Sequence, residues 1–206
     1  MSYWSIHNHP ALTAFEPPQM RKKVFISLVL ISLIGLTALP FQGKPVYEDE
    51  CRLKSFFFEK LTRYIKWPEQ SGMSDKTTPF VIGILGESPL ETCLRELYSQ
   101  KTILRKKVEI KSIETLGGIY GCHIIFIPSS MGKILETVIE VTKNEPILTI
   151  ADTSGFGEQG VLINFYTADK KLRFEINEPA FRRASLTPDS RLLEIARIVK
   201  SRGGEK

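Results

Sequence analysis

Short apolar runs alternate with segments of helical spacing from Phe80 to Ala151. Continuous apolar runs of this length are typical of strands that are covered on both faces of a parallel sheet. The expected elements are, in chain order, a strand at 80–86, a helix at 88–100, a strand at 108–112, a strand at 123–127, a helix at 129–143 and a strand at 146–151. This order predicts βαβ units with right-handed crossovers.

The pattern changes after residue 160. Two strand-like segments, 161–166 and 172–176, are joined by the polar stretch 167–171 and predict a hairpin. Two further helices, at 179–184 and 189–200, are expected to close the domain. The predicted fold class is therefore α/β: a single three-layer domain whose mixed, largely parallel sheet ends in a β-hairpin and is flanked by helices.

A helix is also expected before the first strand, from Cys51 to Lys66. Its apolar residues recur at three- and four-residue steps and form one broad stripe. Phe58 falls off this stripe, so we expect it to be exposed. Together with Tyr64 and Trp67, Phe58 is a candidate surface for a partner or for a second copy of the chain. The alternative is that these aromatic residues belong to the core.

The beginning of the chain has the layout of a secretory signal peptide. Arg21, Lys22 and Lys23 precede the uncharged apolar run 24–36, and Leu36-Thr37-Ala38 offers a small-residue cleavage site. The run is shorter than the roughly 20 residues that span a bilayer. We therefore expect a signal peptide at 20–43, an upstream extension at 1–19, and an exported domain at 44–206. A retained membrane anchor is the alternative.

Charge argues against a nucleic-acid-binding protein. Outside residues 1–43, Lys and Arg outnumber Asp and Glu by only three. The one local basic run, Lys101 with 105–107, falls between a predicted helix and strand and fits a solvated connection. A dedicated nucleic-acid binder usually carries a concentrated basic face instead.

Residues that could carry out catalysis are few. His123 is the only histidine outside residues 1–43 and begins a predicted buried strand, so neither a histidine-based metal site nor a Ser-His-Asp triad is readily assembled. Ser129 follows a strand but lacks the G-x-S-x-G elbow. Asp152 begins a D-T-S-G segment that only partly matches the aspartic-protease loop. We expect no catalytic, cofactor or metal site; a hydrolase using Ser129 and Asp152 is a weaker alternative.

Two further groups of residues are candidates for structural or functional roles. Arg173, Glu175 and Asn177 share one face of a predicted strand, and Asn164 lies across the hairpin. Such a polar cluster is either a structural hydrogen-bond network or part of a partner or ligand surface. The three cysteines permit one disulfide, for which Cys93 and Cys122 are candidates.

Several segments taken together resemble the YfiR family of small exported bacterial proteins. They follow the family's order and spacing from about residue 51 to 200. The matching segments are 64–68 (YIKWP), 80–86 (FVIGILG), 121–127 (GCHIIFI), 146–152 (PILTIAD) with Gly155-Phe156, 160–165 (GVLINF), 173–177 (RFEIN) and 190–193 (SRLL).

The resemblance implies a non-enzymatic periplasmic α/β domain that needs no cofactor and is often a homodimer. It further implies a partner: the periplasmic portion of an inner-membrane diguanylate cyclase, or of a sensor kinase. Repression of such a cyclase would control cyclic di-GMP and biofilm formation. The alternative function is a periplasmic small-molecule binding or sensory domain, with its ligand at the carboxyl ends of the parallel strands, near 86–88, 128–129 and 152–153.

Overall fold

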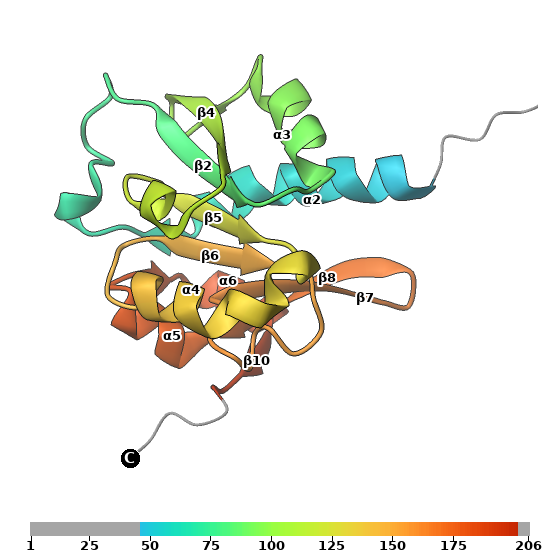
Figure 1. Cartoon of the computed structure of the whole chain (residues 1–206). Helices are drawn as coiled ribbons and strands as arrows, with labels where there is room; N and C mark the ends of the chain where they lie inside the picture. Colours follow the sequence, from blue (N-terminus) through green and yellow to red (C-terminus); the bar gives the residue numbers. More distant parts are fainter. Residues whose placement is uncertain (1–45, 202–206) are drawn as a thin grey trace, which may run out of the picture. The chain divides into compact units, whose positions relative to one another are not determined.

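The computed structural model describes residues 46–201 (Figure 1). The predicted signal peptide and the upstream extension lie outside these residues. Among the described helices, none is both long enough and apolar enough to cross a membrane.

Eight strands form one open, mixed sheet in the order β10-β8-β7-β6-β5-β2-β4-β3. The strands are β2 (Phe80–Leu85), β3 (Thr102–Ile103), β4 (Lys106–Ile113), β5 (Ile124–Ile127), β6 (Leu148–Ala151), β7 (Ile163–Ala168), β8 (Lys171–Asn177) and β10 (Arg197–Val199). Strands β4, β2, β5, β6 and β7 are parallel. Strand β8 is antiparallel to β7, and β10 is parallel to β8. The predicted α/β class, with a largely parallel sheet and a late hairpin, is confirmed.

Helices cover both faces of this sheet (Figure 1). On one face lie α2 (Val46–Arg63), α3 (Leu90–Tyr98), α5 (Glu178–Arg183) and α6 (Ser190–Ile195), and on the other lies α4 (Leu135–Thr142). Residues of β2 alternate between the two apolar layers: Phe80 and Ile82 pack under α2 and α3, while Val81 and Leu85 belong to the layer with α4. The three layers expected from the sequence are present.

Helix α2 is rotated relative to the sequence prediction. Phe58 is fully buried and packs with its ring centroid 6.4 Å from that of Phe126 in β5, so the expectation of an exposed Phe58 is wrong. The buried face of α2 includes two polar residues, Ser55 and Thr62, whose hydroxyls donate to the carbonyl oxygens of Cys51 and Phe58. A buried face predicted from the apolar residues alone omits Ser55 and Thr62, and it is therefore assigned to the wrong side of the helix.

The end of the chain also differs from the prediction. The helix expected over 189–200 stops at Ile195, and Ala196 adopts an extended conformation. Arg197 then lies beside Glu175 as β10 adds to the sheet. Asp189 caps α6 by accepting a hydrogen bond from the amide of Arg191. The spacing of apolar residues in this segment predicts a longer helix, but the pairing of Arg197 with Glu175 places these residues in the sheet instead.

Candidate functional site

Helix α2 presents apolar side chains to solvent on the side that faces away from the sheet. Leu53 and Phe56 lie one turn apart on the helix and are 44% and 41% exposed, and Tyr64, the residue after the helix ends at Arg63, is 37% exposed. Ile195, at the end of α6, is 72% exposed. We call Leu53, Phe56, Tyr64 and Ile195 the contact face. Tyr64 and Ile195 line one groove, and neighbouring exposed apolar residues mark interaction surfaces more often than isolated ones do.

A groove continues the contact face between α2 and α6. It has a volume of about 260 Å³ and is lined by Phe57, Lys60, Leu61, Tyr64, Phe174, Arg191, Leu192 and Ile195. The Arg191 guanidinium lies 5.0 Å from the centroid of the Tyr64 ring, which is within cation–π range. The groove therefore has an apolar floor and basic side chains at its edge.

Only one of the three predicted surface aromatics belongs to the contact face. Tyr64 does, whereas Phe58 is in the core. Trp67 is half-buried and packs edge-on against Phe80, with the ring centroids 6.1 Å apart. Leu53, Phe56 and Ile195 were not identified from the sequence as surface candidates. Periodicity assigned the first two to the buried stripe, and Ile195 to the middle of a longer helix.

The predicted polar cluster is partly assembled, around a buried carboxylate. Glu175 is 2% exposed. Its Oε1 accepts from Asn164 Nδ2 at 2.9 Å, and its Oε2 accepts from Arg197 Nε at 3.0 Å and from Arg197 Nη2. The bond to Glu175 raises the pKa of the Arg197 guanidinium. Arg197 also lies 4.1 Å from the centroid of the Tyr166 ring. This network ties β7, β8 and β10 together.

The other two predicted members of the cluster behave differently. Asn177 accepts a hydrogen bond from the amide of Ala180 and so caps α5, and it donates to the Gly157 carbonyl at 2.7 Å. Arg173 is exposed and pairs with Asp169 near the hairpin turn, 3.6 Å away. The contacts of Asn164, Glu175 and Asn177 fit the structural interpretation of the cluster, and Arg173 is not part of it.

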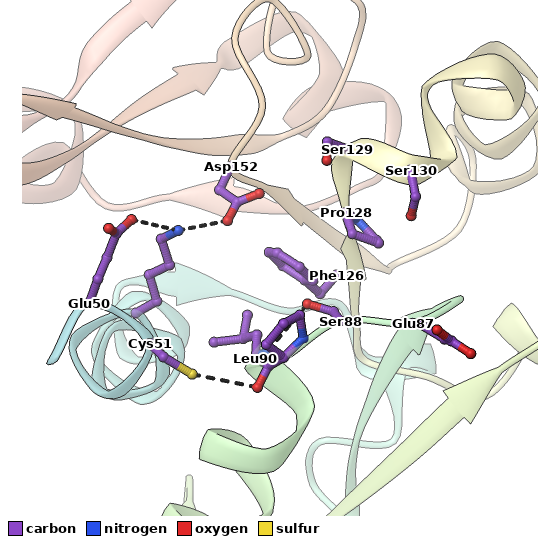
Figure 2. A pocket seen from close by; sticks show the side chains of 12 residues that line it. Glu50, Cys51, Glu87, Ser88, Leu90, Phe126, Pro128, Ser129, Ser130 and Asp152 are labelled. Atoms are coloured by element: carbon purple, nitrogen blue, oxygen red, sulfur yellow. Dashed lines mark hydrogen bonds and ion pairs between the residues drawn. The ribbon is translucent and has the colours of Figure 1, made fainter. Parts of the chain in front are cut away.

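A polar crevice opens where the parallel strands diverge. The connections from β2 and β5 leave toward β4 and β6, on opposite sides, so the carboxyl ends of β2 and β5 form the topological switch point of the sheet. The cavity there has a volume of about 250 Å³ (Figure 2). Its lining comes from α2, from the segments that follow β2, β5 and β6, and from β5 itself: Glu50, Cys51, Lys54, 87–90, Phe126, 128–130 and Asp152.

Lys54 lies on one wall of this crevice, between Glu50 and Asp152. Its Nζ lies 2.8 Å from a carboxylate oxygen of Glu50 and 2.7 Å from one of Asp152. Burial lowers the pKa of Lys54, but the hydrogen bonds and charges of Asp152 and Glu50 outweigh burial and raise it above its ordinary value. Lys54 is therefore protonated at neutral pH, and the three side chains together carry one net negative charge.

The geometry does not assemble a serine hydrolase from the candidate residues. Asp152 pairs with Lys54. His123 immediately precedes β5, whereas Ser129 follows its carboxyl end, so the length of the strand separates imidazole and hydroxyl. Within residues 46–201, no three His, Cys, Asp or Glu side chains are arranged to hold a metal ion.

His123 has a structural contact instead. Its Nδ1 accepts from the amide of Val81 at 2.9 Å, and its ring stacks on Phe80 with the centroids 4.8 Å apart. Burial, followed by the charge of Lys106, lowers the pKa of His123 below its ordinary value of 6.5. The folded protein therefore favours the neutral imidazole, which can accept this hydrogen bond.

Stability should consequently depend on pH through His123. The unfolded chain binds the proton more readily, so this contribution is complete above about pH 6.5 and is lost as the pH falls toward the lower folded-state pKa. We expect the free energy of unfolding, measured by urea denaturation, to decrease between pH 7.5 and 5.5. His123→Asn, which retains an acceptor near the Nδ1 position, should flatten this dependence. An unchanged pH profile in the variant would contradict this assignment.

The disulfide connects different cysteines from those predicted. Cys51 in α2 is bonded to Cys93 in α3, with the Cα atoms 6.1 Å apart, so the Cys93–Cys122 prediction is wrong. Cys122 is a free, buried thiol, and burial raises its pKa. It lies on the other side of the sheet, in the apolar layer with α4. The packing of α2 beside α3 brings Cys51 and Cys93 together, and sequence spacing alone does not show this packing.

The comparisons with known proteins agree with this architecture. The chain belongs to the YfiR/HmsC-like family, whose sequence pattern matches residues 52–197. The family is one of periplasmic proteins with a regulatory and not a catalytic role. None of the curated proteins matches the sequence.

Two solved structures match this chain in part. A conserved domain protein from Vibrio cholerae O1 biovar El Tor superposes with a TM-score of 0.52 at 10% identity, over 73% of this chain and 60% of that chain. The ABC domain of a Streptococcus pneumoniae protein, solved in complex with L-Trp, gives a TM-score of 0.46 at 13% identity, over 72% of this chain and 61% of that one. This chain thus spans about three fifths of the length of either structure. The Vibrio similarity concerns the fold alone.

Proposed function

We propose that this protein is a periplasmic regulator that binds the periplasmic portion of a membrane-bound diguanylate cyclase and holds the enzyme inactive. The observation that carries the proposal is the contact face, which exposes four large, mainly apolar side chains on α2, on the residue that follows it and on α6. Membership of a periplasmic regulatory family supports it. The predicted signal peptide at 20–43 would deliver the chain to the compartment where such a partner is accessible.

In this mechanism, the regulator acts on the conformational equilibrium of its partner. A protein that binds one conformation more tightly than another shifts the population toward the bound form. Repression therefore requires the contact face to fit the inactive conformation of the cyclase better than the active one. An envelope signal that weakens this contact would release the enzyme and raise cyclic di-GMP.

The test is a gene deletion combined with a charge placed on the contact face. Deletion should raise cellular cyclic di-GMP, and the wild-type gene should restore the original level. Tyr64→Asp should fail to restore it, because a charge in a desolvated interface of this kind weakens binding by about thirtyfold. The measurement is cyclic di-GMP by mass spectrometry, alongside immunoblots of the periplasmic fraction.

Tyr120→Asp is the matched control. Tyr120 is also exposed, but it lies next to Ile119, which packs into the layer with α4 on the opposite face of the sheet. This variant should repress as the wild type does. A deletion that leaves cyclic di-GMP unchanged would contradict the proposed function, and equal behaviour of the two variants would contradict the contact face.

A further inference from the structure

The crevice at the switch point has the features of a site for a small molecule. Polar residues from four separate segments line it, and three of its lining residues, Glu87, Ser129 and Ser130, are exposed to solvent. A cavity of about 250 Å³ can hold a compound of about eight non-hydrogen atoms, taking about 30 Å³ for a water-sized group. Convergent polar groups around a preformed cavity are the usual mark of a ligand site.

The charges in the crevice indicate what kind of molecule fits. Glu50 and Asp152 share the single ammonium of Lys54, each through one short contact. Two carboxylates and one ammonium leave a net negative charge on this wall, with further oxygen lone pairs able to accept hydrogen bonds. A second ammonium placed here would balance the charge, whereas a carboxylate or phosphate would be repelled by Glu50 and Asp152.

The rest of the lining suits an apolar body attached to that ammonium. Phe126, Leu90 and Pro128 are buried residues that line the cavity (Figure 2). Ser88 and Ser129 also line the cavity, and a hydroxyl can form a hydrogen bond with a second polar group of the ligand. The crevice thus combines an anionic wall with an apolar one.

We propose that the crevice binds a small organic cation, a primary amine whose ammonium group contacts Asp152 and Glu50 and whose apolar chain packs against Phe126 and Leu90. Binding of the amine involves no covalent step. Lys54 remains in place and limits the affinity, since it already neutralises one of the two carboxylates.

This site is placed to influence the contact face. Glu50 and Lys54 belong to the same helix, α2, as Leu53 and Phe56. An amine that recruits Glu50 and Asp152 alters the Lys54–Asp152 ion pair, which joins α2 to the end of β6. A shift of α2 would then change the fit of Leu53 and Phe56 to a partner. This regulatory consequence rests on the proposed function, whereas the binding site does not.

The binding test compares two probes that differ in charge and are alike in size. Butylamine and butyrate share an apolar chain, so the purified protein should show saturable chemical-shift changes by NMR with butylamine and none with butyrate. Asp152→Asn should weaken butylamine binding by about tenfold, through loss of one close charge pair. Asp169→Asn, the same change at the exposed hairpin turn, should leave the affinity unaltered.

Lys54→Met gives the decisive result. Removing the ammonium leaves both carboxylates without a cation, so butylamine should bind about tenfold more tightly. Binding of butyrate, or loss of butylamine binding in Lys54→Met, would overturn the proposal, as would the absence of saturable butylamine binding to the wild type. If butylamine binds as expected but gene deletion leaves cyclic di-GMP unchanged, the site stands and the proposed function falls.

Discussion

Replacing Phe58 by alanine is expected to lower the free energy of unfolding by about 4 kcal/mol. Phe58 is fully buried and belongs to the apolar layer that holds α2 against the sheet, close to Phe126. Removing the ring deletes its contacts and leaves a cavity that α2 cannot fill, because the disulfide from Cys51 to Cys93 tethers the same helix to α3. Urea denaturation followed by circular dichroism measures the loss.

Phe56→Ala is the matched control for this change. Phe56 is in the same helix, two residues away, and is 41% exposed. The same truncation there should cost less than about 1 kcal/mol, because most of the transfer free energy and all of the cavity term are absent. If both variants lost similar stability, α2 would not be oriented as described.

Replacing Arg197 by methionine is expected to lower the free energy of unfolding by about 3 kcal/mol. The carboxylate of Glu175 is almost wholly buried and depends on Arg197 and Asn164 for its hydrogen bonds. Without the Arg197 guanidinium, the buried Glu175 carboxylate keeps only the hydrogen bond from the neutral side-chain amide of Asn164. Methionine keeps much of the aliphatic length of arginine, so the loss reports the charge and its hydrogen bonds.

Arg173→Met tests the same change where the ion pair is exposed. The Arg173–Asp169 pair is open to solvent on both sides, and such pairs contribute about 0–1 kcal/mol. Its removal should change stability by less than about 0.5 kcal/mol in thermal or urea unfolding. If Arg173→Met lowered the free energy of unfolding strongly and Arg197→Met lowered it only slightly, Arg173 would belong to the polar cluster, as predicted from the sequence, and Arg197 would not.

The positions of the central strands and the fold class followed from the sequence because the signals were local. Continuous apolar runs at Phe80 and Ile124, bounded by turn residues, identified buried strands within one or two residues of their observed ends. The hairpin of β7 and β8 was found for the same reason. Strand β10 was missed, because its three residues have helical spacing in the sequence and become a strand only by pairing with β8, where Arg197 also forms an ion pair with Glu175.

The candidate sites were predictable to different degrees. Asp152 and Ser129 were placed correctly near one another, since the carboxyl ends of neighbouring parallel strands meet at one edge of a sheet. Lys54 was not predicted to be there, because its position depends on how α2 crosses that edge. The burial of Phe58 was also mispredicted, because the buried face of α2 includes the polar residues Ser55 and Thr62. Their hydroxyls form hydrogen bonds within the helix, so these residues can be buried, but a pattern of apolar residues does not include them.

The strands at the two borders of the sheet are among its shortest, with two residues in β3 and three in β10. Short edge strands offer few free main-chain groups for another strand to pair with, which limits edge-to-edge aggregation of the protein. A binding partner is accordingly expected to be recognised through side chains on the helices, and not by extension of the sheet.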